Sequence, residues 1–289
     1  DQTDDLVFLN IKNVDNEDLE LTNTPQANMI QFEDRNNTNK RGYKIIREDF
    51  DFQNIPLNYN DSIWEIRYTH DLQNGNFTIP ENVTLKFNGG KITNYGLIAF
   101  NNTIIEANPV EIFDTSGSFN ATTQNALVNE AVYLEWFGHQ PNIDTTEVAQ
   151  YVANNFKSFT LLSDRKYLIN GLVLDKSFTI YGNQASITDI PNSDSNYIIS
   201  IESNNVIIKD VNFDLAGTKS VAIRMVNGIQ DIFISNCSFV NFILTTDKPI
   251  IYGLSGTHIN GNITIKGCTF FNESEGQFPQ VIIIYNADN

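Results

Sequence analysis

A nine-residue pattern that recurs three times in the last third of the chain restricts its fold more than any other feature. Each copy has two apolar residues separated by one residue, then a turn-forming residue, then two more apolar residues separated by one residue. The copies begin at Asn205, Asp231 and Asn262, at intervals of 26 and 31 residues. The equivalent apolar positions are Val206, Ile208, Val211 and Phe213; Ile232, Ile234, Cys237 and Phe239; and Ile263, Ile265, Cys268 and Phe270. A period of this length is typical of a solenoid, in which each turn of the chain stacks on the previous one.

The residue between the two apolar pairs explains how one turn is built. Asp210, Asn236 and Gly267 occupy this position, and all three residue types accept the left-handed backbone conformation. The chain can therefore bend there while its apolar side chains keep pointing inward. A looser fourth copy at 177–187 lies 28 residues before the copy with Val206. The hairpins of a β-sandwich would not place equivalent residues in register at this period, so we predict an all-β fold, a right-handed parallel β-helix.

The first half of the chain also contains many short strands. The segments NVTLKF and NTIIEA overlay with a shift of about 20 residues, which is a weak internal repeat. Turn signals such as Asn74-Gly75 and Gly89-Gly90 separate the predicted strands. The chain has about 40 asparagines, and asparagine favours tight turns because it tolerates positive φ and hydrogen-bonds nearby backbone.

One segment has helical rather than strand periodicity. In NIDTTEVAQYVANNF, Asp144 followed by Glu147 forms a capping box. The apolar residues Val148, Tyr151, Val152 and Phe156 then follow at helical spacing. We predict one short helix here that caps an open end of the β-core, because an exposed sheet end invites aggregation.

These patterns divide the chain into four parts. Residues 1–40 form an extended N-terminal attachment segment, residues 41–130 a strand-rich first β-helical part, and residues 131–160 a junction with the capping helix. Residues 161–289 form the second β-helix, which we expect to continue beyond the last residue, because VIIIYNADN resembles the start of another strand.

Charge and residue types argue against several functions. The formal net charge is -17, which would repel a phosphate backbone, so we do not expect a nucleic-acid partner. No apolar run is long enough for a membrane span. The three histidines, His70, His139 and His258, have no metal-ligand spacing, and we expect no cofactor. The two cysteines, Cys237 and Cys268, should stack as small apolar residues rather than form a disulfide.

The acidic residues of the repeat are the weak candidates for catalysis. Hydrolysis of a glycan needs two carboxylates facing one groove. Asp210, Asp214 and Asp231 are the candidates, with Glu202 nearby. A turn role explains Asp210 and Asp231 equally well. Trp136 and Phe137 could stack on a sugar or fill the core at the junction.

The stretch YKIIRE…IWEIRYTHDLQNGNFTIPENVTLKFNGGKITNYGLIAFNNTIIEA…EIF…GSF…EWFG resembles tail-fibre and appendage proteins of phages and prophages of gut Bacteroidetes, including crAss-like phages. The segment EWFG…DTTEVAQYV also resembles the start of pectate-lyase-like β-helix domains. There, however, HQPN replaces a Gly-Asp-Gly motif, and Thr145 replaces one of two paired acids.

The resemblance implies a structural virion protein: a phage tail fibre whose β-helical shaft links the tail to a tip that binds host-surface glycan. It implies a homotrimer that docks on other tail proteins through its N-terminal segment and is located extracellularly on the virion. Two alternatives remain open. One is a tailspike depolymerase or a secreted β-helix polysaccharide lyase or hydrolase, and the other is a bacterial surface adhesin.

Overall fold

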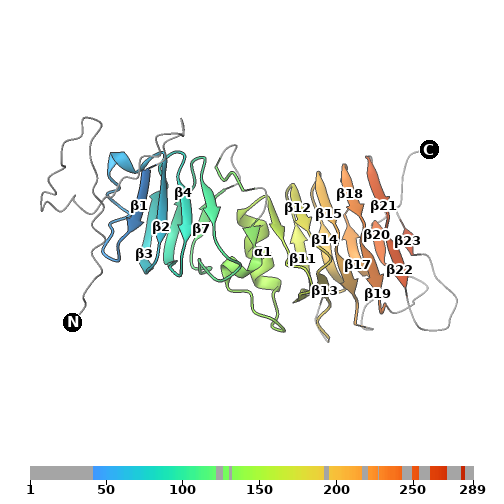
Figure 1. Cartoon of the computed structure of the whole chain (residues 1–289). Coiled ribbons are helices and arrows are strands. Elements are labelled where there is room, and N and C mark those ends of the chain that lie inside the picture. Colours follow the sequence, from blue (N-terminus) through green and yellow to red (C-terminus); the bar gives the residue numbers. More distant parts are fainter. Residues whose placement is uncertain are drawn as a thin grey trace, which may run out of the picture.

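The protein forms an elongated stack of parallel β-strands interrupted by one helix (Figure 1). The computed structural model describes residues 42–121, 126–129, 132–191, 195–216, 221–226, 228–242, 249–253, 261–271 and 281–283. Every strand pair in these segments is parallel, and the strands stack as a β-solenoid of about 8 turns. The prediction of an all-β parallel β-helix with a single short helix is confirmed. The attachment segment expected at 1–40 lies outside the described residues.

The first part of the solenoid has two sheets. Strands β1 (Gly42–Ile46), β2 (Ser62–Ile66), β4 (Thr84–Phe87) and β6 (Ile104–Glu106) form one sheet, in that order. Strands β3 (Thr69–Thr78), β5 (Lys91–Ala99) and β7 (Ser118–Asn120) form the other, and the short 3-10 helix η1 spans Leu57–Tyr59. Thr84 pairs with Ile104, so the predicted shift of 20 residues is the length of one turn.

One of the two predicted turn signals in this part is wrong. Gly89-Gly90 does separate β4 from β5, but Asn74-Gly75 lies within β3. The pairing of β3 with β5 shifts register around Gly75, and Asn74 has a φ of 60°. The Asn-Gly pair that predicted a turn forms a bulge here, which bends the strand without ending it.

The second part has three sheets, so each turn contains three strands. Six strands form the longest sheet: β8 (Val132–Tyr133), β9 (Ser158–Thr160), β12 (Phe178–Tyr181), β15 (Val206–Lys209), β18 (Ile232–Ser235) and β21 (Ile263–Lys266). The second contains β10 (Lys166–Leu168), β13 (Ser186–Thr188), β16 (Asn212–Asp214), β19 (Ser238–Val240) and β22 (Thr269–Phe271). The third contains β11 (Leu172–Leu174), β14 (Tyr197–Ile201), β17 (Val221–Met225), β20 (Ile251–Gly253) and β23 (Ile282–Ile283).

The apolar repeat forms columns inside the second part. Val206 pairs with Ile232 and Ile232 with Ile263, and the Ile208, Ile234 and Ile265 column is formed in the same way. Phe213, Phe239 and Phe270 stack nearly parallel, with centroids 5.0 and 4.9 Å apart. Asp210, Asn236 and Gly267 all have positive φ. This is the bend that the repeat requires, because it turns the chain between two sheets without turning the side chains outward.

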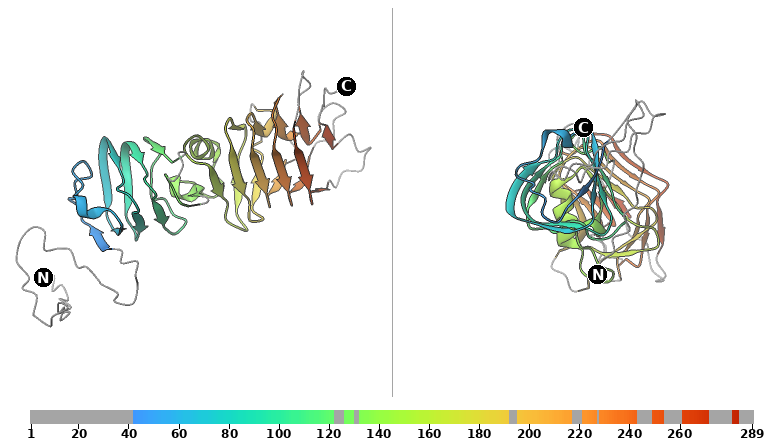
Figure 2. Two further views of the ribbon diagram at one scale, coloured as in Figure 1. Left: turned by 90° about the horizontal axis from the view of Figure 1, so that it is seen from above. Right: turned by 60° about the vertical axis from the view of Figure 1, so that its left-hand side comes forward.

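The helix α1 (Thr146–Asn155) lies between the two stacks rather than at a free end, as both views show (Figures 1 and 2). It follows the 3-10 helix η2 (Leu134–Phe137) and contacts β7 of the first part and β9 and β11 of the second. Val152 and Phe156 are buried, while Val148 and Tyr151 are half-buried against the core. The expectation that Asp144 is the N-cap residue is wrong, since Thr145 occupies that position. The Asp144 carboxylate instead accepts a hydrogen bond from the Thr146 N–H at 2.8 Å.

Candidate functional site

The three candidate catalytic carboxylates lie at separate corners of the solenoid. Asp210 follows β15, Asp214 ends β16, and Asp231 precedes β18. Asp210 and Asp231 therefore flank four-residue strands at opposite ends, five residue steps apart, which places their backbones roughly 16 Å apart along the strand direction. The two carboxylates of an inverting glycosidase are ~6.5–9.5 Å apart. The structure does not bring these three side chains together around one groove.

Each of these aspartates is instead part of a column of polar side chains that connects successive turns. Asn236 donates to Asp210 at 3.2 Å, Asn241 donates to Asp214 at 2.9 Å, and Asn262 donates to Asp231 at 3.2 Å. The first part repeats this arrangement, with Asn82 donating to Asp61 at 2.6 Å and Asn94 to Asp71 at 2.9 Å. In every column named here the aspartate belongs to the earlier turn and the asparagine to the next. The abundant asparagines thus form corners and also link neighbouring corners.

Trp136 and Phe137 belong to the core and not to a sugar-binding surface. Each is 2% exposed. The Trp136 indole N–H donates to the Asn108 carbonyl at 3.1 Å, and the Phe137 ring packs against Phe113, Tyr151 and Phe156. The aromatic residues of η2 therefore fill the space where the two-sheet part meets the three-sheet part.

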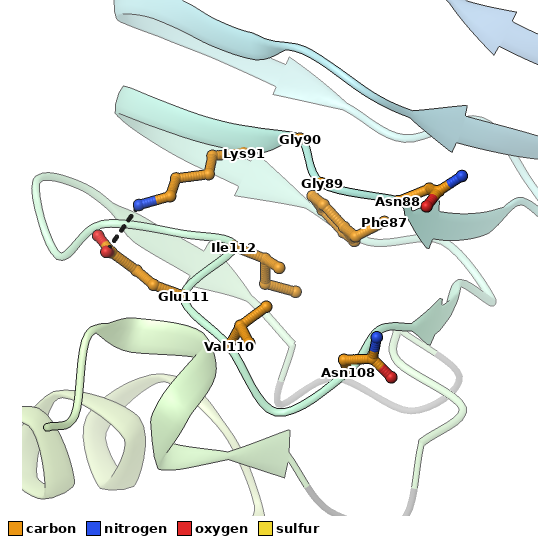
Figure 3. A pocket seen from close by; sticks show the side chains of 9 residues that line it. All are labelled: Phe87, Asn88, Gly89, Gly90, Lys91, Asn108, Val110, Glu111 and Ile112. Atoms are coloured by element: carbon orange, nitrogen blue, oxygen red, sulfur yellow. Dashed lines mark hydrogen bonds and ion pairs between the residues drawn. The ribbon is translucent and has the colours of Figure 1, made fainter. Parts of the chain in front are cut away.

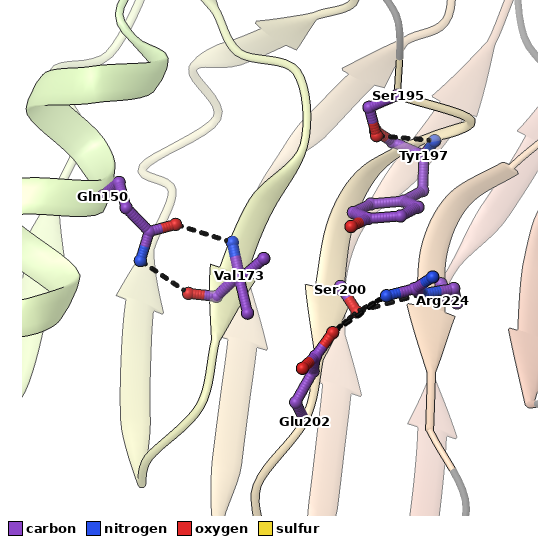
Figure 4. A network of polar contacts seen from close by, with 7 residues as sticks. All are labelled: Gln150, Val173, Ser195, Tyr197, Ser200, Glu202 and Arg224. Carbon is purple, nitrogen blue, oxygen red and sulfur yellow. Dashed lines mark hydrogen bonds and ion pairs between the residues drawn. The ribbon is translucent and has the colours of Figure 1, made fainter.

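Side-chain amides complete the sheets at this junction. Strand β11 is the first of its sheet, so none of the described strands lies beside Val173 on the junction side. Gln150 of α1 accepts from the Val173 N–H at 2.9 Å and donates to the Val173 carbonyl at 3.0 Å (Figure 4). One carboxamide thereby replaces the backbone of a missing neighbour. An unpaired backbone group at a buried edge would otherwise be destabilising.

The sheets of the first part end in the same way. Strand β6 is the last of its sheet, and Asn129 accepts from the Ile105 N–H at 2.7 Å and donates to the Ile105 carbonyl at 3.0 Å. Strand β7 is the last of the other sheet, and the Phe119 N–H donates to Asn155 of α1 at 2.9 Å. Edges on both sides of the junction are therefore closed by amide side chains.

A buried polar cluster lies beside this junction. Glu135 is 3% exposed, and its Oε1 accepts from Tyr167 at 2.7 Å and from Arg165 at 3.1 Å. His139 stacks on the Tyr167 ring with a centroid separation of 4.5 Å. Its Nδ1 lies 2.8 Å from the Thr145 hydroxyl. Burial, together with the charge of Arg165, lowers the pKa of His139 to about 4, so this imidazole is neutral at pH 7.

Glu65 is a second buried carboxylate, on the sheet of the first part. Burial alone would raise its pKa, but hydrogen bonds from Arg67, Asn88 and Tyr43 outweigh burial and lower the pKa to about 2. Arg67 donates at 2.7 Å and Asn88, from the next turn, also at 2.7 Å. Glu65 therefore remains charged and fully engaged in holding neighbouring turns together.

The third sheet carries a partly buried polar network at β14 and β17 (Figure 4). Arg224 donates to Ser200 and forms an ion pair with Glu202 at 2.8 Å. Its guanidinium also lies 4.1 Å from the centroid of the Tyr197 ring. Ser200, Glu202 and Arg224 each have a partner within the network, which joins two successive turns.

A shallow pocket of about 290 Å³ opens at the corner between β4 and β5 (Figure 3). Phe87, Val110 and Ile112 form its apolar part, and Lys91 and Glu111 point toward each other across it, with an ion pair of 2.7 Å. The volume is at the lower limit of ligand pockets, roughly 300–1,000 Å³. Both charged groups are satisfied by each other, so this pocket has no group poised for chemistry.

The remaining candidates have structural environments. Cys237 and Cys268 are free thiols in adjacent turns, and burial raises the pKa of Cys237 to about 12. His70 is buried in the first part, where its ring lies 5.1 Å from that of Phe52, and His258 lies outside the described residues. Within the part of the chain that the structure describes, no cluster of three or more metal-ligating side chains is present. In that same part, no helix has the length and hydrophobicity of a membrane span.

Comparison with protein-family models, with curated proteins and with solved structures finds no match for this chain.

Proposed function

We propose that this chain is a shaft segment of a phage tail fibre or appendage, a structural virion protein that holds a host-binding tip at a fixed distance from the tail. The observation that carries this proposal is the continuity of the stack. About 8 parallel turns follow one another, and the core runs from Ile46 through the junction to Ile251 as a single apolar cluster. A rod with such a continuous core holds its two ends at a fixed separation.

The sealed junction supports the same function. The chain changes from two sheets per turn to three at this point, and such a change would normally expose strand edges. The amides of Asn129, Gln150 and Asn155 close these edges, and the aromatic residues of η2 fill the core between them. A hinge would instead show few buried contacts at the connection. The two parts therefore act as one stiff element.

The polar columns add stiffness of another kind. Each hydrogen bond between an asparagine and the aspartate of the previous turn contributes about 0.5–1.5 kcal/mol and opposes sliding of one turn over the next. Such columns run along both parts. They give the corners of the solenoid a defined register.

In this proposal the chain acts as a homotrimer, is extracellular on the virion, and docks on other tail proteins through residues 1–40. The resemblance of residues 41–160 to fibre proteins supports these features. Immunogold labelling tests the location: antibodies against the purified chain should decorate the tails of virions that encode it. Labelling only of the bacterial surface or of secreted material would refute the location and favour an adhesin or a secreted enzyme.

The second candidate, a depolymerase, rests on the β-solenoid fold alone, because the fold also serves polysaccharide lyases and hydrolases. Incubation of the purified chain with host-surface polysaccharide should produce no new reducing ends. Their appearance, and their loss in Asp214→Asn, would replace the shaft proposal with an enzymatic one.

A further inference from the structure

The loop between η2 and α1 is exposed along most of its length but is anchored at both ends. Residues 140–144 are all exposed, whereas His139 and Thr145 are 8% and 1% exposed. The two anchor side chains meet, since His139 Nδ1 lies 2.8 Å from the Thr145 hydroxyl. We name residues 138–145 the latch loop. A loop with so few buried residues opens at low cost once its anchors are released.

The hydrogen bonds around Thr145 define which ring nitrogen of His139 carries the hydrogen. The Thr145 hydroxyl has one hydrogen, which it donates to the Ile143 carbonyl at 3.0 Å. Its oxygen must therefore accept from His139, so Nδ1 is the protonated nitrogen of the neutral ring. Nε2 is then an acceptor, and it is buried without a hydrogen-bond partner among the described residues. Only the neutral imidazole fits this environment, because a proton on Nε2 would have no acceptor.

The charged groups around His139 do not compensate a proton on its ring. Arg165 carries the charge that acts on the imidazole, and this charge is positive. Glu135 Oε1 accepts from Tyr167 and Arg165. Glu135 Oε2 and His139 Nε2 both have no partner among the described residues, so these two atoms do not hydrogen-bond to each other. The other charged side chains on the neighbouring elements are Asp144, Glu147, Asp164 and Lys166, which are exposed, and Glu111, which forms an ion pair with Lys91.

The latch loop also fixes the start of α1 on the second part of the solenoid. Thr145 is the N-cap residue of α1, and its N–H donates to the Leu168 carbonyl at 2.8 Å. The Thr146 hydroxyl accepts from the Asn170 N–H at 2.9 Å. A loop that opens after the release of His139 takes Thr145 with it and breaks these two bonds. The first turn of α1 would then separate from β10, at the junction between the two stacks (Figure 1).

From this geometry we propose that the latch loop is an acid-sensitive switch of the junction. When His139 takes up a proton, its ring leaves its buried position for water, the loop opens, and the start of α1 separates from the second part. Both stacks remain folded. At neutral pH the loop is closed and the junction is stiff, whereas in acid the junction can bend. The switch belongs to the chain's own junction and does not depend on the shaft proposal.

The direction and size of the pH effect follow from linkage. Burial and the charge of Arg165 hold the pKa of His139 at about 4 in the closed form. Once the loop is open, the ring has its ordinary pKa of about 6.5. The open form therefore binds the proton more strongly, and opening becomes more favourable as the pH falls from about 6.5 to 4. Between pH 7 and pH 5 the equilibrium constant for opening should rise about 20-fold.

Hydrogen exchange of the full chain, followed by mass spectrometry at pH 7 and pH 5, measures this opening. The rates are corrected for the intrinsic effect of pH on amide exchange. Peptides covering 138–149 report on the latch loop, and peptides covering 206–213 report on the columns of the second part. The test variants are His139→Gln, whose carboxamide can still donate but does not titrate, and Thr145→Val, which keeps the shape but removes the hydroxyl. The matched control is His70→Gln, at a second buried histidine that lies in the first part.

In the wild type, the protection of 138–149 should fall about 20-fold between pH 7 and pH 5, and that of 206–213 should not change. His139→Gln should abolish this fall and His70→Gln should retain it. Thr145→Val should increase exchange of the loop at both pH values, because Nδ1 loses its partner. An unchanged loop in the wild type, a fall that persists in His139→Gln, or an equal loss of protection in both peptides would overturn the proposal. If His139→Gln does not fold, the two wild-type peptides still decide.

Discussion

Replacing Gln150 with glutamate tests whether one side chain really substitutes for a missing strand. Glutamate has the same shape as glutamine, but at pH 7 it has no N–H group. It can still accept from the Val173 N–H, but it cannot donate to the Val173 carbonyl, as Gln150 does at 3.0 Å. The loss of this hydrogen bond and the carbonyl left without a donor together predict a destabilisation of about 2–3 kcal/mol.

The same variant should show a distinctive pH dependence. A protonated carboxyl group regains a donor, so the folded state favours the protonated form and raises the pKa of the introduced glutamate above its value in the unfolded chain. The penalty should therefore be complete at pH 7 and shrink as the pH falls through that raised pKa. Wild-type stability measured at each pH provides the reference.

Equilibrium unfolding in guanidinium chloride, followed by the fluorescence of the buried Trp136 beside the junction, measures this effect. Gln140→Glu is the matched control, because Gln140 is exposed in the loop before α1. This change should alter stability by less than about 0.5 kcal/mol. If Gln150→Glu is as stable as the control at pH 7, or if its penalty does not shrink in acid, the edge-capping role of Gln150 is wrong.

Three further substitutions probe the core and the buried charges. Phe239→Ala should reduce the free energy of unfolding by about 3–5 kcal/mol, because its ring is stacked between those of the neighbouring turns at 5.0 and 4.9 Å. The control Phe271→Ala changes a side chain that is 61% exposed and should have little effect. Equal effects of the two variants in urea denaturation would argue against the stacked core. Glu65→Gln should destabilise the protein at pH 7 by about 2–3 kcal/mol. Because the folded pKa of Glu65, about 2, lies below its pKa in the unfolded chain, this loss of stability should be complete above about pH 4.5 and vanish toward pH 2. A loss of stability that does not change with pH would contradict the charge assigned to Glu65. His139 has a pKa of about 4 in the folded state, below its ordinary value. As the pH falls, the unfolded chain therefore binds the proton first, and stability falls between about pH 6.5 and pH 4. His139→Gln should flatten this part of the stability profile in thermal melts, and an unchanged slope would show that another group is responsible.

The fold was predictable because the repeat imposes it residue by residue. Val206, Ile232 and Ile263 are 26 and 31 positions apart and occupy one column. The weaker shift of 20 residues in the first half equals one turn there. Asp210 and Asn236 also adopt the positive φ that their residue types suggested. The repeat of a solenoid is visible in its sequence because each side chain packs on its equivalent in the next turn.

Other features could not be predicted because they depend on which segments meet. Gln150 and Val173 are 23 residues apart, and glutamine at 150 has no pattern that marks it as an edge cap. The Glu135 cluster likewise forms only when η2 packs against Arg165 and Tyr167. The pair Asn74-Gly75 predicted a turn, but pairing with the neighbouring strand β5 makes it a bulge instead. Asn129 and Asn155 are different, because Asn129 follows an apolar segment and Asn155 ends the helix α1. Amides at these two positions of the junction could have been predicted to close strand edges.

The solution mass of the purified chain, measured by light scattering before and after mild heating, tests the central claim that it is a segment of a fibre shaft. The shaft proposal predicts three times the mass of one chain, and a mass that does not change on mild heating. A monomer before heating would contradict the fibre proposal and make a secreted carbohydrate-active enzyme the leading alternative.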